Sequence, residues 1–187
     1  EQNGRRYVDG DPTEGALLVA AEKAGMKKGE LLRDYVIERE FPFDSERKMM
    51  TVIVRDRNGR RFSVTKGAPD VLLERATRLE WNGREQALTP AWKEAVEKAV
   101  HQMAASALRT IAVAYRPLAD NEKIQSEEEA ETRFIFLGVA GMIDPPRPEV
   151  KEAVARCKEA GMKTVMITGD HVLTAKAIAK QLGVLPP

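Results

Sequence analysis

Two junctions in the sequence, each at the end of a predicted strand and the start of a predicted helix, carry side chains that could bind phosphate. Thr168-Gly169-Asp170 follows the apolar residues Val165–Ile167, and Thr65-Lys66-Gly67-Ala68 places a lysine before a glycine. In open α/β sheets, ligands bind beyond the carboxyl ends of the strands, and a helix N-terminus offers N–H groups to phosphate. Both junctions are candidate phosphate sites. By position alone, Asp170 fits a helix cap equally well, and a solvated lysine is the default interpretation of Lys66.

Other kinds of site find no support in the sequence. It contains neither a Walker-type glycine loop nor a G-x-G-x-x-G motif, so a P-loop or dinucleotide fold is not indicated. His101 and His171 are the only histidines, and neither lies in an H-E-x-x-H helix. A single cysteine, Cys157, excludes an intrachain disulfide and a cysteine zinc site.

Composition indicates a soluble globular protein that does not depend on bulk charge. The chain has 187 residues, 43% of them hydrophobic, and its 30 Lys and Arg against 29 Asp and Glu give a net charge of +1. This balance argues against nucleic-acid binding. The longest uncharged apolar run, Phe134–Ile143, is too short to span a membrane, so we expect no direct membrane contact. From the polar first residues we expect no signal peptide in this sequence.

The first half of the chain predicts a helix followed by a hairpin. Asp11-Pro12-Thr13-Glu14 is typical of a helix start, and Tyr35–Phe43 reads as an extended segment. Strands at Met50–Arg55 and Arg61–Lys66 are joined by Asn58-Gly59, the strongest hairpin signal in the chain. A two-residue turn there would pair Thr51 with Lys66.

The middle of the chain predicts further helices and strands. We expect a short helix over residues 68–76, a turn at 81–84, an amphipathic helix after the cap Thr89, and a strand around Ile111–Tyr115. The acidic residues Ser126–Glu131 are interpreted as a solvated loop or helix face that carries no site.

After Phe134 the pattern changes to strand, helix, strand and helix. Predicted strands at Phe134–Ile143 and Lys163–Ile167 alternate with helices from about 149 to 160 and from about 172 to 182, which is typical of a parallel doubly wound sheet. Three prolines within Asp144–Pro148 predict a stiff hinge or domain boundary.

Six segments form a recognisable series in order along the chain: Asp11–Leu17, Phe43–Met50, Lys66–Pro69, Leu108–Ala112, Asp144–Arg147 and Ile167–His171. Together they resemble the nucleotide-binding domain of a P-type cation-transporting ATPase, running into the beginning of the second half of its phosphorylation domain. The sequence around Phe43 is most similar to bacterial calcium-transporting ATPases.

The resemblance implies that the chain binds ATP for a parent pump that transfers the terminal phosphoryl group to an aspartate with magnesium. It makes Phe43 the aromatic that stacks on adenine, Glu14 the carboxylate near the base, and Arg109 the arginine that reaches the phosphates. Lys48 and Lys66 become lysines of the pocket. Thr168, Gly169 and Asp170 would meet the terminal phosphate, with Asp144 and Arg147 at the hinge.

Some of these residues have structural interpretations, and one departs from the family. Glu14 fits a capping box, Phe43 a core position and Arg109 a solvated edge charge. The predicted pairing of Thr51 with Lys66 would put Lys48 on the opposite sheet face from Lys66 unless a bulge intervenes. Ser45 stands where calcium pumps of animal muscle type have an arginine, so the resemblance implies no phosphate contact at that position.

We therefore predict an α/β fold: a mostly antiparallel sheet flanked by helices over residues 1–143, then a hinge and partial Rossmann-like unit over 144–187. The family's Asp-Lys-Thr-Gly-Thr acceptor motif and Gly-Asp-Gly segment do not occur in the sequence. We expect a cytoplasmic domain of an integral membrane protein that binds ATP weakly without turnover and works with the pump's phosphorylation, actuator and membrane domains. The alternatives are a non-catalytic interaction module and a haloacid dehalogenase-like phosphohydrolase.

Overall fold

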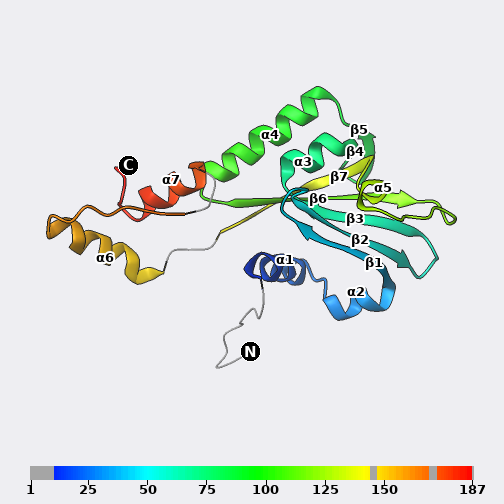
Figure 1. Ribbon diagram of the computed structural model, residues 1–187, viewed down its shortest axis with the longest axis horizontal. Helices are drawn as coiled ribbons and strands as arrows, with labels where there is room; N and C mark the ends of the chain where they lie inside the picture. Colours follow the sequence, from blue (N-terminus) through cyan, green and yellow to red (C-terminus); the bar gives the residue numbers. More distant parts are fainter. Residues whose placement is uncertain (1–10, 144–146, 169–171, 187) are drawn as a thin grey trace. The chain divides into compact units, whose positions relative to one another are not determined.

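The computed structural model describes residues 11–143, 147–168 and 172–186 (Figure 1). The chain divides into two compact units, residues 1–65 with 115–132 and residues 66–114 with 133–187. Its strands form a mostly antiparallel seven-stranded sheet in the order β1-β2-β3-β6-β7-β4-β5. The predicted α/β class with flanking helices is confirmed. The predicted division at Asp144 stays a prediction.

The first unit begins with two helices and then builds a meander of strands. It contains α1 (Pro12–Lys23), α2 (Lys28–Asp34), β1 (Tyr35–Asp44), β2 (Met49–Asp56), most of β3 (Arg61–Gly67), the end of β6 (Arg109–Leu118) and α5 (Glu127–Ala130). On β2, the residues Met49, Thr51 and Ile53 are buried and are separated by the half-buried Met50 and Val52. This two-residue period turns one face of the strand to the core.

The core of this unit lies where β1, β2 and β6 meet the segment that ends in α5. Phe41, Ile53, Leu118, Ile124 and Ala130 form one cluster of buried side chains. Phe41 is the only buried residue of β1, whose other side chains are exposed. One large ring thus ties the edge strand to the core.

The second unit packs helices against the other strands. It contains α3 (Pro69–Arg75), β4 (Ala76–Trp81), β5 (Arg84–Ala87), α4 (Pro90–Ala105), the rest of β6, β7 (Phe134–Met142), α6 (Pro148–Glu159) and α7 (Val172–Gln181). Helix α3 lies against both β7 and α4 (Figure 1). β4 runs parallel to β7 and antiparallel to β5. The β4–β5 turn has positive φ at Asn82 and Gly83, as a type I′ hairpin requires.

The hairpin between β2 and β3 forms as predicted, but its register is shifted. The Asp56 N–H donates to the carbonyl of Arg60, and Gly59 has a φ of +82°, so the loop is residues 57–59 and not a two-residue turn. Thr51 therefore faces Thr65, with 2.8 Å between the two hydroxyl oxygens. The predicted pairing of Thr51 with Lys66 was wrong by one residue, because a left-handed glycine adds a bulge to the turn.

Two other expectations differ from the structure. Residues 163–167 are not a strand, and the side chains of Val165 and Ile167 are 71% and 95% exposed. A strand needs a hydrogen-bonded neighbour, and no described strand pairs with this segment. Within the acidic stretch, residues 127–130 do form a short helix, but Glu131, which follows it, is 1% exposed. The interpretation of the stretch as solvated was wrong at that residue.

Candidate functional site

Phe43 lies at a bulge near the end of the edge strand. Phe41 pairs with Thr51 and Asp44 pairs with Met49, so Pro42 and Phe43 on β1 stand opposite a single residue of β2. In an unbroken strand, Phe43 would share the buried face of Phe41, because side chains alternate with a period of two. The extra residue breaks this alternation. Phe43 is 65% exposed while Phe41 is 4% exposed, so the structure presents the Phe43 ring to solvent.

The turn that follows Phe43 is closed by its own aspartate. The carboxylate oxygen Oδ1 of Asp44 accepts hydrogen bonds from the N–H groups of Glu46 at 2.9 Å and Arg47 at 2.8 Å. The Arg47 N–H bond is the main reason that the pKa of Asp44 is lowered; burial opposes this, and the Glu46 N–H adds to it. The N–H of Lys48 donates to the carbonyl of Asp44 at 2.7 Å.

Lys48 is exposed in this turn with a φ of +54°. It precedes β2, which begins at Met49, so the alternation of strand faces does not apply to it. From the sequence, we expected Lys48 and Lys66 to lie on opposite faces of the sheet. That expectation used the wrong register for the hairpin and treated Lys48 as part of the strand. That objection to Lys48 is removed.

The same turn is tied to a buried carboxylate. A guanidinium nitrogen of Arg47, Nη1, donates to Oε1 of Glu131, whose side chain is fully buried. This oxygen also accepts from the Thr51 hydroxyl at 2.9 Å, and Thr51 bonds Thr65. Nη2 of Arg47 donates to the carbonyl of Pro42 at 2.8 Å. Neither Arg47 nor Glu131 is among the site residues predicted from the sequence, although Arg47 lies within a segment that carries the resemblance.

Glu14 lies in the first turn of α1, in the same unit as Phe43 and Lys48. The Asp11 side chain caps this helix and accepts hydrogen bonds from the N–H groups of Thr13 at 2.7 Å and Glu14 at 3.2 Å. The predicted cap and start of the helix are confirmed. The Glu14 side chain is exposed.

The second unit holds the remaining predicted site residues. Lys66 is half-buried near the end of β3, just before the buried Gly67 and helix α3, as the strand-to-helix pattern predicted. Arg109 begins β6 and is exposed, and Thr168 is exposed after a segment without a strand. Arg147 is the residue before α6. Gly169, Asp170 and Asp144 lie outside the described residues.

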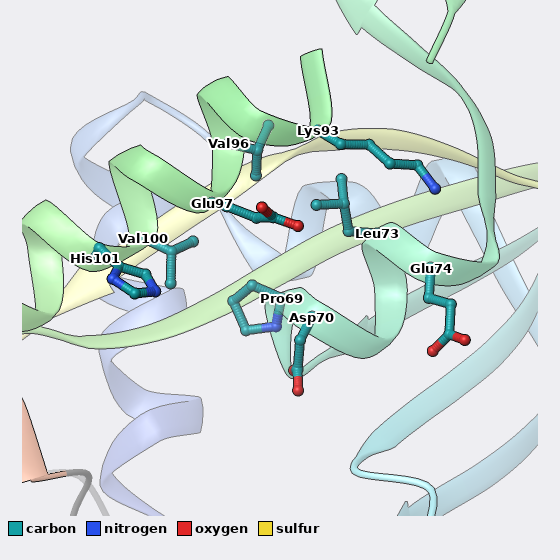
Figure 2. A pocket seen from close by; sticks show the side chains of 9 residues that line it. All are labelled: Pro69, Asp70, Leu73, Glu74, Lys93, Val96, Glu97, Val100 and His101. Carbon is teal, nitrogen blue, oxygen red and sulfur yellow. The ribbon is translucent and has the colours of Figure 1, made fainter. Parts of the chain in front are cut away.

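A groove between α3 and α4 lies within the second unit and contains none of the predicted site residues (Figure 2). It has a volume of about 350 Å³. Its charged lining is acidic, because the carboxylates of Asp70, Glu74 and Glu97 outnumber the ammonium of Lys93. Carboxylates repel a polyanion, so this groove is not suited to a phosphate ligand.

Neither a metal centre nor a membrane span is found among the described residues. Within 11–143, 147–168 and 172–186, no group of three or more His, Cys, Asp and Glu side chains is arranged to hold a metal ion. The helices in this part of the chain also lack the combined length and apolar character that crossing a bilayer requires.

Comparison with known families identifies the chain's relatives. Residues 1–149 match the family model described as "P-type ATPase, cytoplasmic domain N". The chain belongs to the P-type ATPase family. This match covers Glu14, Phe43, Lys48, Lys66 and Arg109, and it confirms the resemblance on which their assignment depends. The predicted localisation as a cytoplasmic domain agrees with the description of the matched family.

Individual relatives cover all or nearly all of the chain but are much longer. The chain is 53% identical over 186 residues to "Calcium-transporting ATPase" of Bacillus subtilis and 46% identical over 175 residues to "Calcium-transporting ATPase 1" of Bacillus cereus. It is 39% identical over 188 residues to a sodium/potassium exporting P-type ATPase of Schizosaccharomyces pombe. These matches include 100%, 94% and 100% of the chain, which spans only 21%, 19% and 18% of the relatives. The similarity to bacterial calcium-transporting ATPases is confirmed.

Proposed function

We propose that this chain is the ATP-binding domain of a P-type cation pump. The observation that carries the proposal is Phe43, an aromatic ring 65% exposed at a bulge, within the segment matched to domain N. An exposed ring next to a polar turn is suited to stacking on a base, because stacking does not require a particular pattern of hydrogen-bond donors and acceptors. In the parent protein, hydrolysis of ATP through an aspartyl-phosphate would drive cation transport.

The proposed contacts follow the family residue by residue. Phe43 stacks on adenine and Glu14 lies near the base, while Lys48, Lys66 and Arg109 supply positive charge for the phosphates. Hydrogen bonds between charged groups and phosphate are stronger than neutral ones, which favours cations in these roles. Thr168, Gly169 and Asp170 are proposed to meet the terminal phosphate, and Asp144 and Arg147 to form the hinge.

We propose that the chain by itself binds ATP weakly and does not turn it over, because its sequence contains no Asp-Lys-Thr-Gly-Thr acceptor. Magnesium is proposed to act in the parent protein together with ATP and to neutralise phosphate charge there. The remaining domains of the pump, for phosphorylation, actuation and membrane transport, are the proposed partners. Incubating the chain with Mg-ATP should release no phosphate above the buffer control.

Calcium is the proposed transported ion, because calcium-transporting ATPases from two Bacillus species are among the relatives. A sodium/potassium exporting relative shows that similarity in this domain extends to pumps for other ions. ATP-driven ⁴⁵Ca uptake into vesicles that contain the full-length protein tests the ion. Uptake of sodium or potassium without calcium would contradict the assignment.

Titration of ATP against substituted chains tests the binding site. Phe43→Ala should weaken ATP binding by roughly 5- to 150-fold, the effect of losing one stacked base. Lys66→Ala should weaken it by roughly tenfold, because a charged hydrogen bond to phosphate is lost. Isothermal titration calorimetry measures both affinities.

Two matched substitutions control for general damage. Tyr35→Ala removes another exposed aromatic from β1, and Lys98→Ala removes an exposed lysine from α4. Neither should change the affinity for ATP by more than about twofold, since both lie outside the proposed contacts. Unchanged ATP affinity in both Phe43→Ala and Lys66→Ala would refute the site.

A further inference from the structure

Arg47 joins two points of the turn that carries Phe43 to a buried glutamate outside it. Its guanidinium donates to the Pro42 carbonyl at 2.8 Å, just before Phe43, and to the buried carboxylate of Glu131. Its own N–H closes the turn on Asp44 at 2.8 Å. The side chain is 23% exposed, so it lies largely inside the protein. One arginine thus holds both the entry and the middle of the turn.

Glu131 is itself fixed from the other side. Its Oε1 accepts from the Thr51 hydroxyl at 2.9 Å, and Thr51 and Thr65 are both fully buried on neighbouring strands. The residue before Glu131, Ala130, accepts a hydrogen bond from the Ser63 hydroxyl at 2.8 Å through its carbonyl. β2 therefore binds this carboxylate directly, and β3 holds both the Thr51 hydroxyl and the backbone just before Glu131. The position of the turn is set relative to the sheet and not by the turn alone.

Charge explains why the connection is firm. A carboxylate buried without a counter-ion is strongly unfavourable, whereas hydrogen bonding to a guanidinium stabilises it. Electrostatic attraction is also stronger in the low-dielectric interior than at the surface. The attraction between Arg47 and Glu131 therefore also holds the backbone of the turn, to which Arg47 is bonded.

We propose that Arg47 and Glu131 are positioning residues for nucleotide binding: they fix the turn of residues 42–48 so that the Phe43 ring is held ready for the base. This inference rests on the proposed function, in which Phe43 stacks on adenine. Holding the ring before the ligand arrives lowers the entropy lost on binding. Neither residue needs to touch the nucleotide for this effect.

A double-mutant cycle tests whether Arg47 acts through Phe43. Arg47→Ala should weaken ATP binding by about tenfold in the wild-type chain but by less than about twofold in a Phe43→Ala background, because the ring that it positions is already absent. Calorimetry of the four chains gives the comparison, at a temperature where circular dichroism shows each to be folded. Thr51→Val, which removes one anchor of Glu131, should act in the same direction with a smaller effect.

Arg39→Ala is the matched control. Arg39 also joins β1 to the segment that leads into α5, by a 2.9 Å hydrogen bond to the Ile124 carbonyl, and its guanidinium lies 4.7 Å from the centre of the Phe41 ring. This hydrogen bond does not involve the turn at residues 42–48. Its removal should leave ATP affinity within about twofold of wild type.

Backbone ¹⁵N relaxation without nucleotide gives an independent measurement. In Arg47→Ala the order parameters of residues 43–48 should fall from about 0.85 to below about 0.7, whereas Arg39→Ala should leave them unchanged. If Phe43→Ala does not alter ATP affinity, the proposed adenine contact is wrong, and relaxation still decides whether Arg47 orders the turn. The positioning role is overturned by an unchanged turn in Arg47→Ala, or by an Arg47 effect that is equally large with and without Phe43.

Discussion

The two turns at the ends of β2 use the same local chemistry but differ in what holds them. In each, an aspartate accepts two backbone N–H bonds through Oδ1: Asp44 from Glu46 and Arg47, and Asp56 from Asn58 at 2.9 Å and Arg60 at 2.8 Å. The arginine of the second turn, Arg60, returns to its own aspartate at 2.7 Å and is 68% exposed. The arginine of the first reaches a fully buried glutamate far away in the sequence.

This difference separates a self-contained turn from one that is anchored in the core. The turn between Asp56 and Arg60 requires a residue with positive φ, and Gly59 adopts that conformation without strain. The Phe43 turn places Lys48 in the left-handed region, where a side chain is unfavourable. The anchor through Arg47 and Glu131 offsets that local cost. A strained turn held by a distant contact is typical of a functional position.

The largest expected difference between the two turns comes from removing the arginine of each. Arg47→Ala should lower the free energy of unfolding by about 3 kcal/mol, because it leaves Glu131 buried without its counter-ion. Arg60→Ala should lower it by less than about 1 kcal/mol, because its ion pair is exposed to solvent at the arginine. Urea unfolding followed by circular dichroism measures both.

Amide hydrogen exchange in β2 assigns any loss to this unit of the chain. Glu131→Gln is a useful companion, because it keeps the size of the side chain and an oxygen for Thr51 while removing the charge. It should be less destabilising than Arg47→Ala. Equal losses for Arg47→Ala and Arg60→Ala would show that the two turns do not differ in anchoring.

The left-handed residues should respond in opposite directions. Gly59→Ala should destabilise the chain by about 1–2 kcal/mol, since a Cβ is unfavourable at positive φ. Apart from its two neighbours in the chain, no atom of the described residues lies within 4 Å of the Cβ that it would add, so backbone conformation is the reason for the loss. Lys48→Gly should stabilise by about 0.5 kcal/mol, because relief of strain exceeds the extra entropy lost by glycine. Thermal unfolding of both chains shows the signs; a destabilised Lys48→Gly would contradict the strain argument.

Sequence patterns located both turns but could not give their geometry. Asn58-Gly59 predicts a hairpin correctly, yet the same dipeptide fits a two-residue turn and the loop of residues 57–59 with a bulge. Pro42 indicates the end of a strand, but not the extra residue that turns Phe43 outward. The residue types in the local sequence indicate that a turn forms, while pairing with the neighbouring strand fixes the register.

Residues that act over long distances in the sequence were not predictable. Glu131 lies 84 residues from Arg47 in an acidic stretch, and nothing local distinguishes it from the exposed glutamates before it. The opposite error occurred at residues 163–167, where an apolar run favours a strand but no described strand pairs with it. The site residues themselves came from the resemblance to P-type ATPases, and their contact with ATP stays a prediction.

The smallest expected difference between the turns is their response to acid. Hydrogen bonds from Arg47 and Glu46 lower the pKa of Asp44. Burial raises the pKa of Asp56, but hydrogen bonds from Arg60 and Asn58 outweigh it, so that pKa is also lowered. A pKa lower in the folded state than its ordinary 3.8 stabilises the fold above that value, and the stabilisation is lost as pH falls through the folded pKa.

Both turns should therefore weaken below about pH 4, and the urea midpoint should be nearly constant above about pH 5. Asp44→Asn and Asp56→Asn should each reduce this loss of stability at low pH, because an asparagine oxygen still caps the turn but does not titrate. Some loss of stability at low pH should remain when both aspartates are replaced, because Glu38 also titrates. Burial raises the pKa of Glu38, but hydrogen bonds from Arg61 and Arg55 outweigh burial, so its pKa is lowered. The urea midpoint of the variant that carries both Asp44→Asn and Asp56→Asn can be compared with that of the wild type at each pH. If the two fall equally at low pH, the aspartates do not contribute as charged caps, and their turns must be held by backbone hydrogen bonds and arginines alone.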